Sequence, residues 1–159
     1  MEDPQLPARQ HHFQAEAAAV GQTAAALDAF CAAERVPRDA LWPFQVALDE
    51  IVANIVSHAA AGNGGRVFEV CFRRDGEAIE IIVADDGPPF DPLARPDPDV
   101  SLPLERRQPG GLGIMLVKSL MDDVRYERTT RNVLTIRKRI SAGGGPDEAG
   151  PDEHSAERT

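Results

Sequence analysis

Two apolar runs separated by an Asp-Gly pair are the feature that most constrains the fold of this chain. Residues 66–74 and 78–85 alternate or run apolar, and Asp75-Gly76 lies between them. An Asp-Gly pair flanked by such runs is the strongest short signal of a β-hairpin, because a tight two-residue turn needs a positive φ. The sequence therefore predicts an antiparallel strand pair, which argues against a doubly wound parallel sheet.

The remaining elements are predicted from apolar periodicity and from the residues that end each run. Three segments have the spacing of helices: 16–34, 39–60 and 113–121. Three more have the pattern of strands, the first a short edge strand and the last two a second hairpin: 9–13, 124–128 and 132–140. The order strand, helix, helix, hairpin, helix, hairpin favours a two-layer α+β sandwich.

The proline-rich stretch between the first hairpin and the last helix divides the chain. Residues 86–109 contain seven prolines, which exclude a helix or an inner strand. A long loop inside a compact domain is usually a functional lid or a disordered segment. We predict one domain over 9–140 with a lid at about 86–110, a flexible N-terminus over 1–8 and a disordered acidic tail over 141–159.

Composition narrows the class of protein. The chain has 159 residues, which suits one domain with its own core, and a formal net charge of −9. So acidic a domain repels phosphate backbones, which argues against a nucleic-acid partner and leaves room for a basic protein partner. The sequence has no apolar stretch long enough to span a membrane and no signal-peptide pattern, so we expect a cytoplasmic protein.

Glu50 and Asn54 form the first of three candidate functional segments. They lie four residues apart on the predicted helix 39–60 and therefore share a face of it. A carboxylate beside an amide oxygen suits Mg²⁺, a hard cation that keeps waters and binds substrate phosphates. The carboxylate can instead take a proton from a nucleophile. Taken alone, the pair fits a solvated helix face better than a functional site.

Asp85 and Gly87 form the second segment. Asp85 ends the apolar strand 78–85, where its carboxylate can accept a hydrogen bond from an exocyclic amine such as that of adenine. Gly87 allows a tight turn and leaves room for a flat base. The alternative is a plain turn, since Asp-Asp-Gly-Pro is favourable turn chemistry.

The third segment is Gly110-Gly111-Leu112-Gly113, which opens the helix predicted over 113–121. Free backbone amides at a helix start bind phosphate well. The segment is neither a Walker A loop nor a Rossmann fingerprint, because the following residues lack the lysine of the first and the glycine spacing of the second. A hinge between the lid and the helix is the alternative.

In this order and spacing, segments 47–59, 85–92 and 110–122 resemble the N, G1 and G2 boxes of the GHKL ATPase superfamily. Within it, the chain resembles the small, free-standing branch of anti-sigma-factor serine/threonine protein kinases. The likeness covers about residues 10–140. It implies the GHKL (Bergerat) form of the α+β sandwich, with a mixed, mostly antiparallel sheet and helices on one face. Pro89, where many superfamily members have a second glycine, fits this branch and argues against a histidine kinase.

The resemblance also implies roles for single residues. Glu50 would be the general base, Asn54 would bind Mg²⁺, and Asp85 would read the adenine amino group of ATP. The other residues that it implies to contact ATP are Gly87, Gly110, Gly111, Leu112, Gly113 and Thr135.

The branch that the chain resembles works by partner switching. The resemblance implies an ATP- and Mg²⁺-dependent kinase, commonly a homodimer, that binds a sigma factor or another regulator in one state. In the other state it binds and phosphorylates a STAS-domain anti-sigma factor antagonist, and an opposing serine phosphatase reverses the reaction. Two alternatives are a non-catalytic ATP/ADP switch that sequesters a partner and, less well supported, a histidine-kinase catalytic domain. His11-His12-Phe13 lacks the phosphoacceptor pattern that a histidine kinase needs.

Overall fold

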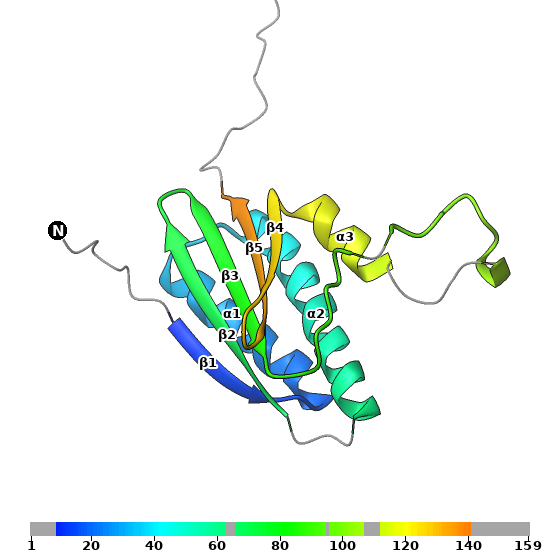
Figure 1. Cartoon of the computed structure of the whole chain (residues 1–159). Coiled ribbons are helices and arrows are strands. Elements are labelled where there is room, and N and C mark those ends of the chain that lie inside the picture. The colour runs from blue at the N-terminus through cyan, green and yellow to red at the C-terminus, as the bar shows by residue number, and fades with distance from the viewer. Residues whose placement is uncertain (1–8, 63–65, 95, 107–111, 141–159) are drawn as a thin grey trace, which may run out of the picture.

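The structure, a computed structural model, describes residues 9–62, 66–94, 96–106 and 112–140. These residues form two layers, a five-stranded sheet and three helices that cover one of its faces (Figure 1). The predicted α+β sandwich is therefore confirmed. All four strand pairs of the described sheet are antiparallel, whereas the resemblance implied a mixed sheet.

The strand order places three distant parts of the chain at one end of the sheet. The order is β1-β2-β3-β5-β4, with strands β1 (Arg9–Gln14), β2 (Val67–Asp75), β3 (Ala78–Asp85), β4 (Asp123–Arg128) and β5 (Asn132–Arg139). Asp85, the last residue of β3, lies opposite Phe68 of β2 and Asn132 of β5. The start of β2 and the start of β5 thus flank the end of β3.

The hairpin between β2 and β3 differs by one residue from the predicted turn. Asp75 is paired with Ala78, so the two-residue loop is Gly76-Glu77 and not Asp75-Gly76. Gly76 has a φ of 58°, and no positive φ is recorded for Glu77. A positive φ at the first central position alone is the requirement of a type II′ turn, which only glycine meets without strain.

The helices pack on the sheet through the faces that the apolar periodicity predicts. They are α1 (Ala18–Ala33), α2 (Arg38–Ala61) and α3 (Leu112–Leu120). On α2, the residues Phe44, Leu48 and Val52 are fully buried in the core against apolar side chains of the sheet. Each such side chain stabilises the fold by about 1.5–3 kcal/mol through the apolar area that it removes from water. The same packing fixes where the opposite, polar face of α2 points.

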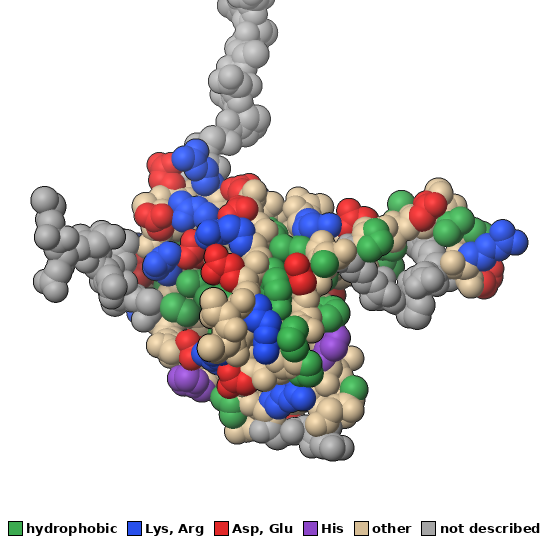
Figure 2. Space-filling view, in the orientation of Figure 1, with side chains coloured by type: hydrophobic (Ala, Val, Ile, Leu, Met, Phe, Trp, Pro, Cys, Tyr) green, Lys and Arg blue, Asp and Glu red, His purple; other side chains and the backbone are tan. Residues whose placement is uncertain are grey.

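The other face of the sheet carries charged side chains of both signs (Figure 2). Glu80 of β3 is 4 % exposed, yet it forms ion pairs with Arg73 of β2 and Arg137 of β5. Arg137 also contacts Asp75 at 2.9 Å. Burying an unpaired carboxylate costs free energy. The two arginines pair with Glu80 and so explain how its charge is tolerated at the centre of this face.

Of the segment between β3 and α3, residues 96–106 extend away from the two layers (Figure 1). The prediction that the prolines exclude a helix is wrong for one turn of 3₁₀ helix, η1 (Leu104–Arg106). Asp97 contacts Lys118 of α3 at 2.5 Å and so ties the segment to that helix.

The predicted contacts of Gly110 and Gly111, and the predicted terminal segments 1–8 and 141–159, lie outside the described residues. Within the described part of the chain, no helix is both long and apolar enough to cross a membrane.

Candidate functional site

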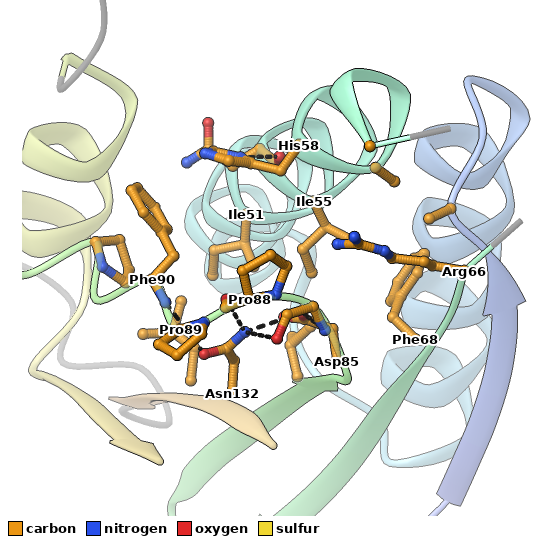
Figure 3. Close-up of a pocket in the computed structure, with 18 of the residues that line it drawn as sticks. Ile51, Ile55, His58, Arg66, Phe68, Asp85, Pro88, Pro89, Phe90 and Asn132 are labelled. Carbon is orange, nitrogen blue, oxygen red and sulfur yellow. Dashed lines mark hydrogen bonds between the residues drawn. The ribbon is translucent and has the colours of Figure 1, made fainter. Parts of the chain in front are cut away.

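A pocket of about 390 Å³ opens between the C-terminal half of α2 and the end of β3 (Figure 3). Its walls are mainly apolar, with side chains such as Ile55 from α2 and Phe68 and Leu134 from the sheet. The lining residues with polar side chains are Asn54, His58, Arg66, Asp85, Tyr126 and Asn132. An apolar cavity of this size with a few convergent polar groups is typical of a site for a small organic ligand.

Asp85 is held in this pocket by one of its two carboxylate oxygens. Its Oδ1 accepts hydrogen bonds from the backbone N–H of Gly87 at 2.9 Å and from Nδ2 of Asn132 at 3.1 Å (Figure 3). Among the described residues, nothing donates to its Oδ2. Asp85 therefore offers one oriented acceptor to a ligand that carries an N–H group.

Asn132 is the centre of the polar network, and the sequence analysis missed it. This residue begins β5 and is 7 % exposed. Besides Asp85, its Nδ2 donates to the carbonyl oxygens of Gly87 at 3.3 Å and Pro88 at 2.9 Å. The side chain thereby fixes both Asp85 and the turn that follows it.

The amide oxygen of Asn132 is equally engaged. It accepts hydrogen bonds from the Tyr126 hydroxyl at 2.5 Å, from Nη1 of Arg128 at 3.0 Å and from the backbone N–H of Phe90 at 3.3 Å. One buried amide thus joins β4, β5 and the start of the segment after β3. The signal that identifies it is its place opposite Asp85, which only the strand register reveals.

Thr135, expected to help hold adenine, does not reach the pocket. Leu134 lines the pocket and Ile136 is buried in the core. Successive side chains of a strand point to opposite faces, so Thr135 points away from the helices, beside Ile82 of β3. The resemblance implied Thr135 without regard to this alternation, whereas Asn132, three residues earlier on the same strand, lines the pocket.

We expect Asn132→Ala to lower the free energy of unfolding by about 2–3 kcal/mol, because it leaves buried donors and acceptors unpaired. Thr135→Ala is the matched control on the other face of the same strand, with an expected loss below about 1 kcal/mol. Denaturant unfolding of both variants measures the difference. Equal losses in the two variants would contradict the role of Asn132 as the centre of the network.

Glu50 lies beside the start of α3, next to the pocket rather than in its wall. A Cβ added at Gly113 would lie 2.2 Å from Oε2 of Glu50, so the carboxylate occupies the space that a side chain there needs. Asn54, one turn further along α2, lines the pocket itself. Leu112, the first residue of α3, is exposed. The polar face of α2 therefore leads from the pocket to the N-terminal end of α3.

His58 and Phe90 stand at the rim of the pocket. The two rings have centroids 4.5 Å apart, and Nδ1 of His58 lies 2.6 Å from the backbone oxygen of Asn54 (Figure 3). Asp86, the second acid of the turn, instead pairs with Arg131 at 2.9 Å and is exposed. The structure thus brings Asn54, Asp85 and Gly87 to one pocket and separates Asp86 from it.

Comparison with known proteins identifies one family and several related kinases. Residues 13–138 match the family described as the histidine kinase-like ATPase domain. The chain is 31% identical over 80 residues to the serine/threonine-protein kinase BtrW of Bordetella bronchiseptica, covering 50% of this chain and 56% of the relative. It is 34% identical over 90 residues to the serine-protein kinase RsbW of Bacillus cereus, covering 54% and 56%. The aligned region thus spans little more than half the length of these relatives.

Among solved structures, the fold resembles the RsbU and RsbW domains of Rv1364c from Mycobacterium tuberculosis. The TM-score is 0.59 at 17% sequence identity, over 85% of this chain and 32% of that chain. At this identity the likeness bears on the fold alone, and it agrees with the two layers described above.

Proposed function

Because the chain belongs to the family of histidine kinase-like ATPase domains, we propose that it binds ATP with Mg²⁺ and phosphorylates a serine or threonine of a protein partner. The observation that carries the proposal is the line of polar groups from Asp85 in the pocket, through Asn54, to Glu50 at the start of α3. The kinase names of the relatives support the reaction.

The pocket around Asp85 fits the base of ATP. Its apolar walls suit a flat aromatic ring, and the free Oδ2 of Asp85 can accept a hydrogen bond from the adenine amino group. Gly87 is buried there, and a Cβ at this position would lie 2.7 Å from Oδ1 of Asp85, so a side chain would disturb the carboxylate. The close approach explains why glycine stands two residues after Asp85 in this turn.

The polar groups near α3, Asn54 and Glu50, suit the phosphates of ATP and the hydroxyl group that accepts the phosphoryl group. The amide oxygen of Asn54 is a hard ligand of the kind that Mg²⁺ takes together with phosphate oxygens and water. When bound, Mg²⁺ neutralises charge on the transferred phosphoryl group. Glu50 would accept the proton of the attacking serine or threonine hydroxyl, the role of a positioned general base.

We propose a STAS-domain anti-sigma factor antagonist as the substrate, with a sigma factor or another regulator as the alternative partner. The relatives RsbW and BtrW are named as serine and serine/threonine kinases, which supports a kinase of this class over a histidine kinase. A homodimer and an opposing serine phosphatase complete the proposed switch.

Phosphotransfer is the decisive experiment. STAS-domain partners are captured from a lysate of the source organism on the purified protein with Mg-ADP, and then Mg-ATP is added. Intact mass spectrometry should detect one added phosphoryl group on the partner, and Asn54→Ala should remove it. A captured partner that stays unmodified while ATP binds would replace the kinase proposal by a nucleotide-gated binding switch.

Gly113→Ala is expected to lower phosphoryl transfer by about 10²-fold with little loss of stability. The new methyl group displaces the flexible end of Glu50, and a shift of about 1 Å at a reacting group costs that much in rate. Gly21→Ala in α1 is the matched control, because nothing lies within 4 Å of its added Cβ. It should keep full transfer and stabilise α1 by about 0.5–1 kcal/mol. Equal transfer rates in the two variants would mean that the space left by Gly113 does not determine the position of Glu50.

A further inference from the structure

Arg66 is a cation in a pocket whose walls are mainly apolar. Its side chain extends into the pocket from the residue before β2, toward Ile55 of α2 (Figure 3). Its backbone oxygen accepts a hydrogen bond from the N–H of Ala15 at 2.7 Å, which fixes the main chain at this point. Neither the sequence motifs nor the proposed reaction accounts for a guanidinium here.

Two glycines leave the space that this guanidinium occupies. A Cβ added at Gly62, after the end of α2, would lie 3.0 Å from Nη2 of Arg66. A Cβ added at Gly87 would lie 2.9 Å from Nη1. The planar group therefore reaches from the end of α2 to the turn after β3, across one side of the pocket.

The guanidinium lies beside the carboxylate of Asp85 but does not form an ion pair with it. Nη1 of Arg66 and Oδ1 of Asp85 both lie within 3 Å of the same point, the missing Cβ of Gly87. Within the described parts of the chain, however, Arg66 is in no ion pair at 4.0 Å or less. The pocket thus presents a group that only donates hydrogen bonds next to a group that only accepts them.

Adenine has the complementary pair on its edge. Its amino group donates, and the ring nitrogens on either side of that group, N1 and N7, accept. We propose that Arg66 is a specificity-determining residue of the nucleotide site, which donates to one of these ring nitrogens while Asp85 accepts from the amino group. This inference rests on the proposal that the pocket binds the base of ATP.

The test is calorimetric titration of the full chain with Mg-ATP, Mg-7-deaza-ATP and Mg-1-deaza-ATP. We expect Arg66→Ala to bind ATP about tenfold more weakly, the loss typical of a hydrogen bond to a charged group. The wild type should lose about tenfold affinity for the one analogue that lacks the contacted nitrogen. Arg66→Ala should bind that analogue and ATP equally, since the contact is already absent.

Arg125→Ala is the matched control, because Arg125 is exposed on β4 and pairs with Asp123. Its affinity for ATP should equal that of the wild type, and thermal unfolding of each variant verifies folding. If Arg66→Ala binds ATP as tightly as the wild type or more tightly, or discriminates between the analogues as the wild type does, the role of Arg66 is overturned. Failure of the wild type to bind ATP would overturn the proposed function, and this inference with it.

Discussion

Glu50→Gln is expected to reduce phosphoryl transfer by about 10²- to 10⁴-fold, the usual contribution of a general base. Glutamine keeps the size and hydrogen-bonding reach of the side chain but cannot take up a proton at neutral pH. The affinity for ATP should stay within about twofold, because Glu50 lies beside α3 and does not line the pocket that would hold the base.

Single-turnover transfer to the captured partner measures the rate, and calorimetry measures the affinity for ATP. Glu127→Gln, an exposed substitution on β4, is the matched control and should behave as the wild type. Transfer at the wild-type rate in Glu50→Gln would remove Glu50 from the role of base and leave its contact with α3 as a structural one.

Asp85→Asn is expected to weaken ATP binding by about 100-fold. Two donors, the Gly87 N–H and Nδ2 of Asn132, would hold the amide oxygen of the new side chain in the place of Oδ1. Its NH₂ group would then take the place of Oδ2 and face the amino group of adenine, donor against donor. Losing a hydrogen bond to a charged acceptor and gaining this mismatch account for the size of the effect.

Asp86→Asn is the matched control for this prediction. Asp86 is the next residue along the chain, but its carboxylate points to Arg131 and solvent. Calorimetry should give an affinity for ATP within about twofold of the wild type. Similar losses at the two positions would mean that charge at this turn matters in general and that Asp85 does not read the base.

The fold was largely predictable because its signals are local. Strand β3 was predicted with its observed bounds, and the apolar stripe of α2 packs as its spacing indicates. The turn after β2 was misplaced by one residue, since Asp75-Gly76 and Gly76-Glu77 both contain the glycine that the turn needs. Only the pairing of Asp75 with Ala78 distinguishes them.

The site was less predictable because its contacts are not local. Asn132 meets Asp85 across 47 residues, and the resemblance alone pointed to Thr135 on the wrong side of the same strand. Arg66 carries no motif and acquires its place only because glycines at positions 62 and 87 make room for it. Motifs identified which segments meet, whereas strand register and close packing decide which side chains face the pocket.

The antiparallel pairing of β3 with β5 has a consequence for how chains of this kind diverge. The connection between these strands includes α3 and β4, and its part before α3 is a long loop whose two ends the layers hold in place. The entropy cost of closing a flexible loop rises only with the logarithm of its length, by about 0.6 kcal/mol for each doubling. Insertions and deletions in residues 96–106 are therefore cheap. The same segment begins at the pocket with Pro88 and Phe90, so its outer part can change in length without redesigning the sheet that carries Asp85 and Asn132.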